Sequence, residues 1–173
     1  MTMLTKLTNG LFRASGAAAV VFLVLIGAII IAQVGARLLG HQIPSANDFS
    51  AWCMGASLFL ALPDTLRAEE HIRVSLLLDR AGPKLSRTMD VLSTLIGSGA
   101  LIWGSWHMVS YTYMSWQYHD VSQGIIAFPL WIPQSAVALG LVLFLLAMVE
   151  RLIRLCLGID LPKPPSALDL HEV

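Results

Sequence analysis

Charged side chains are scarce in this chain of 173 residues, and they are unevenly placed along it. Asp, Glu, Lys and Arg make up 13% of the sequence, compared with the ~25% that is typical of soluble domains. No charge occurs in residues 14–36, 49–63, 91–119 and 121–149. Most helices of a soluble protein keep one polar face in water, so runs of this kind exclude a soluble enzyme. A bilayer accepts them, because about 20 apolar residues span its ~30 Å core.

Several signatures of soluble chemistry are missing too. The net charge is zero, so the chain lacks the basic surface that binds nucleic acid. The sequence has no GxxxxGK(S/T) or GxGxxG loop for ATP or dinucleotides. Its two cysteines, Cys53 and Cys156, lie in different apolar segments and lack the spacing of metal ligands. We therefore expect no cofactor, no metal and no nucleic-acid partner, and a lipid bilayer as the surroundings.

The first charge-free run, residues 14–36, follows Lys6 and Arg13 and is long enough to span a membrane. A basic start before an apolar run also occurs in cleavable signal peptides, whose apolar regions usually have about 7–15 residues. This run has 23 residues, so we expect a retained first helix.

Three further spans follow the first. One begins near residue 49 and is charge-free only over 49–63, so it must borrow flanking residues. The next covers about 91–116, and the last enters at the Phe-Pro-Leu-Trp-Ile-Pro sequence and covers about 128–149. The prediction is an all-α polytopic membrane protein with four transmembrane helices in a single domain over residues 1–157. The tail, residues 158–173, contains three prolines and is expected to be a disordered cytoplasmic end.

The stretch between the second and third spans, from Asp64 to Asp90, holds nearly half of all the charges. Within it, apolar residues alternate with Arg73 and Ser75: Ile72, Val74, Leu76, Leu77 and Leu78. This apolar set is too short to span a bilayer. We expect a short membrane-surface amphipathic segment between helices 2 and 3.

Lys and Arg are distributed unequally between the two sides of the predicted bundle. With both termini in the cytoplasm, ten basic residues lie inside and only Arg37 lies outside. Cytoplasmic loops of membrane proteins carry this excess. Trp52, Trp116, Tyr118 and Trp131 then fall near the outer face, where aromatic residues are enriched. The sequence therefore predicts that both termini are cytoplasmic.

Ionisable groups inside a span usually mark an ion or proton path, because burying them is costly. No Asp, Glu, Lys or Arg lies well inside a predicted span, which argues against an independent small four-helix transporter with a buried carboxylate. His107 is the one titratable group deep in a predicted helix, and we expect it to pack and hydrogen-bond. A membrane-anchor subunit of a redox enzyme would need two facing histidines for haem. The other four lie in loops or tails: His41, His71, His119 and His171.

A cluster of mixed charge follows the second predicted span directly: Arg67, Glu69, Glu70, His71 and Arg73. Acidic residues contribute little to membrane orientation, so topology alone does not explain this cluster. We expect its members to pair with each other or with a neighbouring protein, and a plain solvated loop stays open as the alternative.

The same cluster carries a resemblance to a known family. The pattern Arg67-x-Glu69-Glu70-His71-Ile72-Arg73-Val74 in a four-span chain resembles the small membrane subunit (DctQ type) of tripartite ATP-independent periplasmic (TRAP) transporters. A second match is Ser122-Gln123-Gly124, followed by Pro129-x-Trp131-Ile132-Pro133 and Gly140. The resemblance covers about residues 14–155. One departure is Ser75, where many relatives have an acidic residue.

The resemblance implies a non-enzymatic subunit of a complex in the bacterial inner membrane. The implied partners are a large multi-span membrane subunit, which carries the substrate and sodium sites and moves as an elevator, and a periplasmic substrate-binding protein. Together they would import an organic acid, with the small subunit holding the static part of the large one. The candidate interface residues are Arg67, Glu69, Glu70, His71, Arg73, Trp131 and Pro133. The independent transporter and the redox anchor stay open as alternatives.

Overall fold

A computed structural model describes residues 3–67 and 83–157 of the chain. This part is helical and contains four helices: α1 (Met3–Leu38), α2 (Ala46–Arg67), α4 (Pro83–Gln117) and α5 (Trp131–Leu157). The described residues form no β-strand, only one isolated bridge between Val121 and Pro129. The prediction of an all-α chain is therefore confirmed.

Each helix extends beyond its charge-free run. α4 begins at Pro83, where a missing backbone N–H costs little, and α5 continues past residue 149 to Leu157. The extension of α5 carries an ion pair between Arg154 and Glu150, with 2.6 Å from nitrogen to oxygen. A charged side chain marks the end of the membrane-spanning segment but does not end the helix, because the hydrogen bonds of the helix backbone continue into water.

Two helices end in the same kind of turn. After α1, Gly40 has a φ of 77°, and the N–H of His41 donates to the Ala36 carbonyl at 2.9 Å. After α4, His119 has a φ of 55°, and the N–H of Asp120 donates to the Ser115 carbonyl at 3.0 Å. These bonds satisfy carbonyls that a helix end otherwise leaves without a donor.

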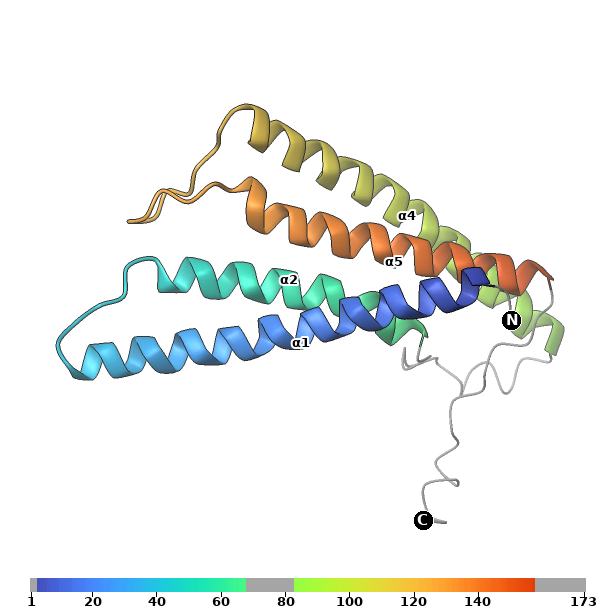
Figure 1. The fold of residues 1–173 in the computed structure, drawn as a ribbon. Helices are drawn as coiled ribbons and strands as arrows, with labels where there is room; N and C mark the ends of the chain where they lie inside the picture. The colour runs from blue at the N-terminus through green and yellow to red at the C-terminus, as the bar shows by residue number, and fades with distance from the viewer. Residues whose placement is uncertain (1–2, 68–82, 158–173) are drawn as a thin grey trace, which may run out of the picture.

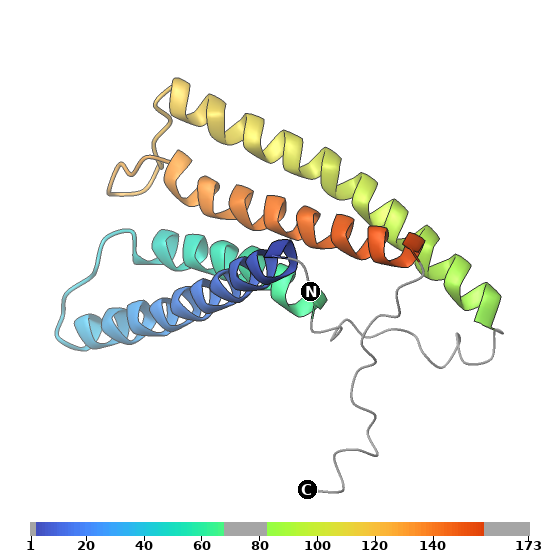
Figure 2. The same ribbon diagram turned by 45° about the vertical axis from the view of Figure 1, so that its right-hand side comes forward.

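The four helices stand in a row in the order α1, α2, α5, α4 (Figure 1). α1 and α2 form one antiparallel hairpin, α4 and α5 form the other, and α2 packs along α5 between them (Figures 1 and 2). We call the end that carries the connections 39–45 and 118–130 the loop end, and the opposite end the terminal end. Because the row is one helix thick, each helix keeps large surfaces free of contact with the others.

The core lies mainly toward the terminal end. There α1 crosses over α2 and reaches α5, so that Phe12, with 1% of its surface exposed, packs with Leu66 and Ala147. The neighbouring cluster consists of small and medium side chains: Ala19, Ala56, Leu60 and Leu143. Small residues let helix backbones approach closely where lipid provides no hydrophobic drive to associate.

Two serine hydroxyls bond across the α1–α2 hairpin to carbonyls of the facing helix. The Ser15 hydroxyl donates to the Leu60 carbonyl at 2.6 Å, and the Ser57 hydroxyl donates to the Ala19 carbonyl at 3.0 Å. In an apolar environment each of these bonds is worth about 0.6–2 kcal/mol.

The contact between α2 and α5 depends on Pro63 and Gly140. Pro63 lies inside α2 and has no N–H, so the Phe59 carbonyl loses its usual helical donor. Gly140 of α5 packs directly on this carbonyl, since a Cβ built at position 140 would lie 2.6 Å from the Phe59 carbonyl carbon and 2.8 Å from its oxygen. Only glycine allows so close an approach, in which a Cα–H can face the freed oxygen.

Three of the described helices are long and apolar enough to be candidate membrane spans: Thr8–Leu38, Ala46–Leu66 and Trp131–Leu157. The second of these borrows flanking residues, as its short charge-free run predicts. α4 does not qualify by composition, because Ser, Gly, Thr, Trp and Tyr dilute its apolar residues. The predicted count of four spans is thus confirmed for three helices. The amphipathic segment around residues 72–78 and the tail at 158–173 lie outside the described residues.

Candidate functional site

Three of the predicted interface residues are described: Arg67 lies at one end of the bundle, and Trp131 and Pro133 lie at the other. Arg67 is the last residue of α2, at the terminal end. Glu69, Glu70, His71 and Arg73 lie outside the described residues.

Trp131 and Pro133 open α5 at the loop end. Pro133 is half-buried in the first turn, where its missing N–H has no helical acceptor to lose. Arg67 and the Trp131 region are therefore separated by the length of the bundle.

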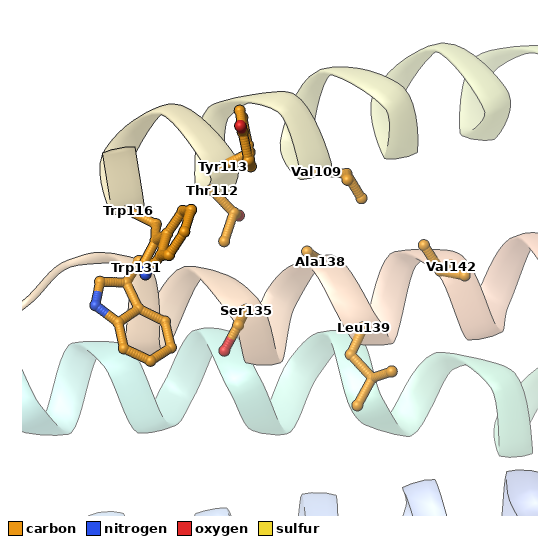
Figure 3. A pocket seen from close by; sticks show the side chains of 9 residues that line it. All are labelled: Val109, Thr112, Tyr113, Trp116, Trp131, Ser135, Ala138, Leu139 and Val142. Atoms are coloured by element: carbon orange, nitrogen blue, oxygen red, sulfur yellow. The ribbon is translucent and has the colours of Figure 1, made fainter. Parts of the chain in front are cut away.

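Trp131 lines an apolar groove between α4 and α5 (Figure 3). The groove has a volume of about 490 Å³. Trp116 of α4 and Trp131 of α5 lie together at its loop end, whereas Val109 and Val142 lie at its other end (Figure 3). Its remaining lining comes from the same two helices: Thr112, Tyr113, Ser135, Ala138 and Leu139. With so little polar lining, the groove suits an apolar occupant and not an organic anion.

The connection between α4 and α5 folds back on itself around Ser122. The Ser122 N–H donates to the Phe128 carbonyl at 2.8 Å, and the Phe128 N–H donates to the Ser122 hydroxyl oxygen at 3.1 Å. The same hydroxyl donates to the Ile126 carbonyl at 2.8 Å. The first residue of the Ser122-Gln123-Gly124 motif is therefore a turn residue that shapes this loop.

A clasp joins this loop to the start of α2. The Ile126 N–H donates to the Ser45 hydroxyl oxygen at 3.1 Å, and Gly124 lies so close to Ser45 and Asp48 that a Cβ there would collide with both side chains. The rings of Phe49, Trp52 and Phe128 pack beside this contact, with centroids 5.0–5.3 Å apart. The glycine of the motif is needed because the side chains of Ser45 and Asp48 occupy the space that its own side chain would take.

The clasp borders a polar hollow of about 350 Å³ at the loop end. Its wall includes Gln33 and Arg37 of α1, and Asn47 and Asp48 of α2, with 3.2 Å between the Gln33 amide nitrogen and the Asn47 oxygen. The described residues contain no group of three or more His, Cys, Asp or Glu side chains that could hold a metal ion.

The sequence alone does not give the surroundings of Asp64 and His107. Asp64, the first residue of the charged stretch, lies within α2, and its carboxylate packs against Gly16 of α1. His107 is exposed on α4, with its ring 4.6 Å from that of Trp103. Within the described residues it makes no hydrogen bond, so the bond expected of His107 is not found in this part of the chain. The pairing of Asp64 with Gly16 has no local sequence signal, because it joins residues on different helices.

These features define a class: an all-helical membrane protein whose distinctive residues serve packing and surface contact. A family model described as tripartite ATP-independent periplasmic transporters, DctQ component, matches residues 13–158. The chain belongs to this family and is thus a small subunit of a TRAP transporter, not an enzyme. No curated protein matches the chain.

Proposed function

We propose that this chain is the scaffold subunit of a sodium-coupled importer of an organic acid in the bacterial inner membrane. In this proposal it crosses the membrane four times and holds the static part of the large membrane subunit, while a periplasmic binding protein delivers the substrate. The observation that carries the proposal is the family match over residues 13–158, joined to a row of helices with large free surfaces.

The placement of basic residues supports cytoplasmic termini. Arg13, Arg151 and Arg154 lie toward the terminal end, and Arg37 is the only basic residue of the described chain at the loop end. Since basic residues are retained on the cytoplasmic side, the loop end faces the periplasm.

Three observations support α4 as the fourth span. Residues 91–119 carry no charge, the 35-residue helix is about 50 Å long at 1.5 Å per residue, and it runs beside α5 along most of its length (Figures 1 and 2). An odd number of spans would also put the two ends of the chain on opposite sides.

A supporting role fits the described side chains better than independent transport. Asp48 lies in the first turn of α2 and Asp64 near its last turn, so both acids are close to the membrane boundaries. An independent proton- or sodium-coupled carrier requires such a group along its path. The alternative of a redox anchor has only His107 for haem ligation within a membrane helix.

The proposed orientation predicts which side of the membrane each end reaches. In a background lacking Cys53 and Cys156, Ser86→Cys at the start of α4 is expected to resist an impermeant thiol reagent added from outside. Gln123→Cys in the α4–α5 connection, which is exposed, should react and serves as the control. Labelling at position 86 in intact cells would overturn the proposed orientation.

The charge cluster after α2 is proposed to pair with the large subunit. Arg73→Glu is expected to leave insertion normal but to reduce co-purification of the large subunit and uptake. Removing one partner of a desolvated ion pair costs about 2–5 kcal/mol of association. Lys163→Glu makes the same charge change in the tail and is the control. If Arg73→Glu gives wild-type co-purification and uptake at equal expression, the cluster is an ordinary solvated loop.

A further inference from the structure

α4 presents two unlike faces. Its face toward α5 carries small hydroxylated side chains that are almost fully buried: Thr94, Ser98, Ser105 and Ser115. Its opposite face carries residues spaced three or four apart, which we call the outward stripe: Ile96, Ala100, Trp103, His107, Tyr111 and Met114. Every member of the outward stripe is exposed. Because α4 stands at the edge of the row, its only extensive helix contact is with α5, on the other side (Figure 2).

The outward stripe carries a polar side chain, His107, at the depth where lipid is least polar. His107 lies ten residues before the end of α4 at Gln117, or about 15 Å along the helix. That distance is about half of the ~30 Å hydrocarbon core. The Tyr111 hydroxyl lies one turn nearer the loop end, and in the part of the chain described here neither side chain has a hydrogen-bond partner. Hydrocarbon offers no such partner, so lipid is a poor match for this face.

The exposure of Trp103 also indicates that the outward stripe contacts protein. Trp103 is 69% exposed, although it lies deeper in the helix than Trp116, which marks the aromatic belt near the loop end. Tryptophan exposed to lipid favours the membrane interface, because its ring has a polar N–H. A large exposed ring with a polar edge near mid-membrane is typical of the centre of a protein contact.

α1, at the other edge of the row, provides the contrast. Its large exposed side chains over the middle of the helix are aliphatic, including Val24 and Ile31, which is 74% exposed. Lipid covers such a face without leaving a polar group unpaired. The exposed polar groups of the outward stripe therefore distinguish α4 from α1, the other edge helix.

We propose that the outward stripe of α4 packs against a transmembrane helix of the large membrane subunit. That helix carries a hydrogen-bonding side chain level with His107 and approaches most closely at Ala100. The occupant is identified by polar complementarity, since His107 and Tyr111 need partners that lipid lacks. This inference rests on the proposed function, in which the chain binds the large subunit within one assembly.

The test is co-purification of the large membrane subunit with variants of the full chain, expressed together. His107→Leu is expected to lower the recovered large subunit by about threefold to thirtyfold, from the ~0.6–2 kcal/mol of one bond between membrane helices. His107→Gln keeps a donor and an acceptor and should recover most of the loss. Ala100→Trp should abolish recovery by filling the point of closest approach.

The matched control is Ile31→Trp on the aliphatic face of α1, which should co-purify as the wild type does. Equal insertion and an unchanged elution volume of each chain expressed alone show that the variants fold. Wild-type recovery for both His107→Leu and Ala100→Trp would overturn the proposed surface. If the wild-type chain itself recovers no large subunit, the proposed function fails instead.

A cross-link identifies the occupant directly. A photo-reactive benzoylphenylalanine at Tyr111, in the intact complex, is expected to form an adduct with the large subunit. The same residue at Ile31 should not form this adduct. A dimer of the small subunit, or adducts with lipid alone, would show that the stripe faces a second copy or the bilayer and would reject the proposal.

Discussion

Gly140→Ala is expected to lower the melting temperature of the purified chain by about 2–12 °C and to reduce its insertion. Its new Cβ would lie 2.6–2.8 Å from three atoms of Phe59, two of them in the backbone, so α2 and α5 must separate. Overpacking of this kind costs about 1–3 kcal/mol, and in a chain of this size each kcal/mol is worth about 2–4 °C. Thermal unfolding in detergent, followed by tryptophan fluorescence, measures the change.

Gly27→Ala is the matched control, because a Cβ at position 27 meets no atom within 4 Å. Alanine forms helix better than glycine, so this variant should melt at the same temperature or slightly higher. Equal melting of the two variants would show that close packing at Gly140 does not hold the hairpins together.

The second large effect concerns transport. Liposomes that contain this chain without the large subunit are expected to show no uptake of an organic acid, even with a sodium gradient and the periplasmic binding protein present. The reason is physical: in the described helices, Asp48 and Asp64 lie near the span ends, and His107 faces outward. Radiolabelled substrate retained on a filter provides the measurement.

Liposomes with both membrane subunits and the binding protein form the control and should accumulate substrate. Liposomes with the large subunit and binding protein but not this chain should accumulate far less, because the static part lacks its support. Uptake by the small subunit alone would contradict the proposed scaffold function and would favour an independent transporter.

The number, order and approximate limits of the helices could be predicted from the sequence. Charge-free runs reveal apolar segments directly, since burying a charge in lipid is costly. The helix ends could not be predicted, because the runs show where the bilayer stops and the helices continue beyond it. α5 thus includes Glu150 and Arg154, which lie one and five residues past the last predicted span residue and form an ion pair.

The sites could be predicted only in part. Trp131 and Gly124 were found as motif residues, but their contacts could not be, because each meets side chains from another helix. The contact of Gly140 with Phe59 also could not be predicted from the sequence. Pro63 within a helix indicates only that the carbonyl four residues earlier lacks its usual hydrogen-bond donor. The sequence identified His107 as a titratable group deep in a predicted span. Its outward direction could not be predicted, because it depends on which face of α4 packs against α5.

The two hairpins meet mainly along α2 and α5, so each can tilt as a unit relative to the other. Each hairpin has its own internal contacts. The angle between the hairpins is set by three contacts: the Ser45–Ile126 clasp, the Gly140–Phe59 contact and the Phe12 cluster. These three contacts lie at different heights along the bundle, so together they fix both the opening angle and the twist. A change at the clasp or at the Gly140–Phe59 contact would therefore tilt α4 relative to α1 without altering the contacts inside either hairpin.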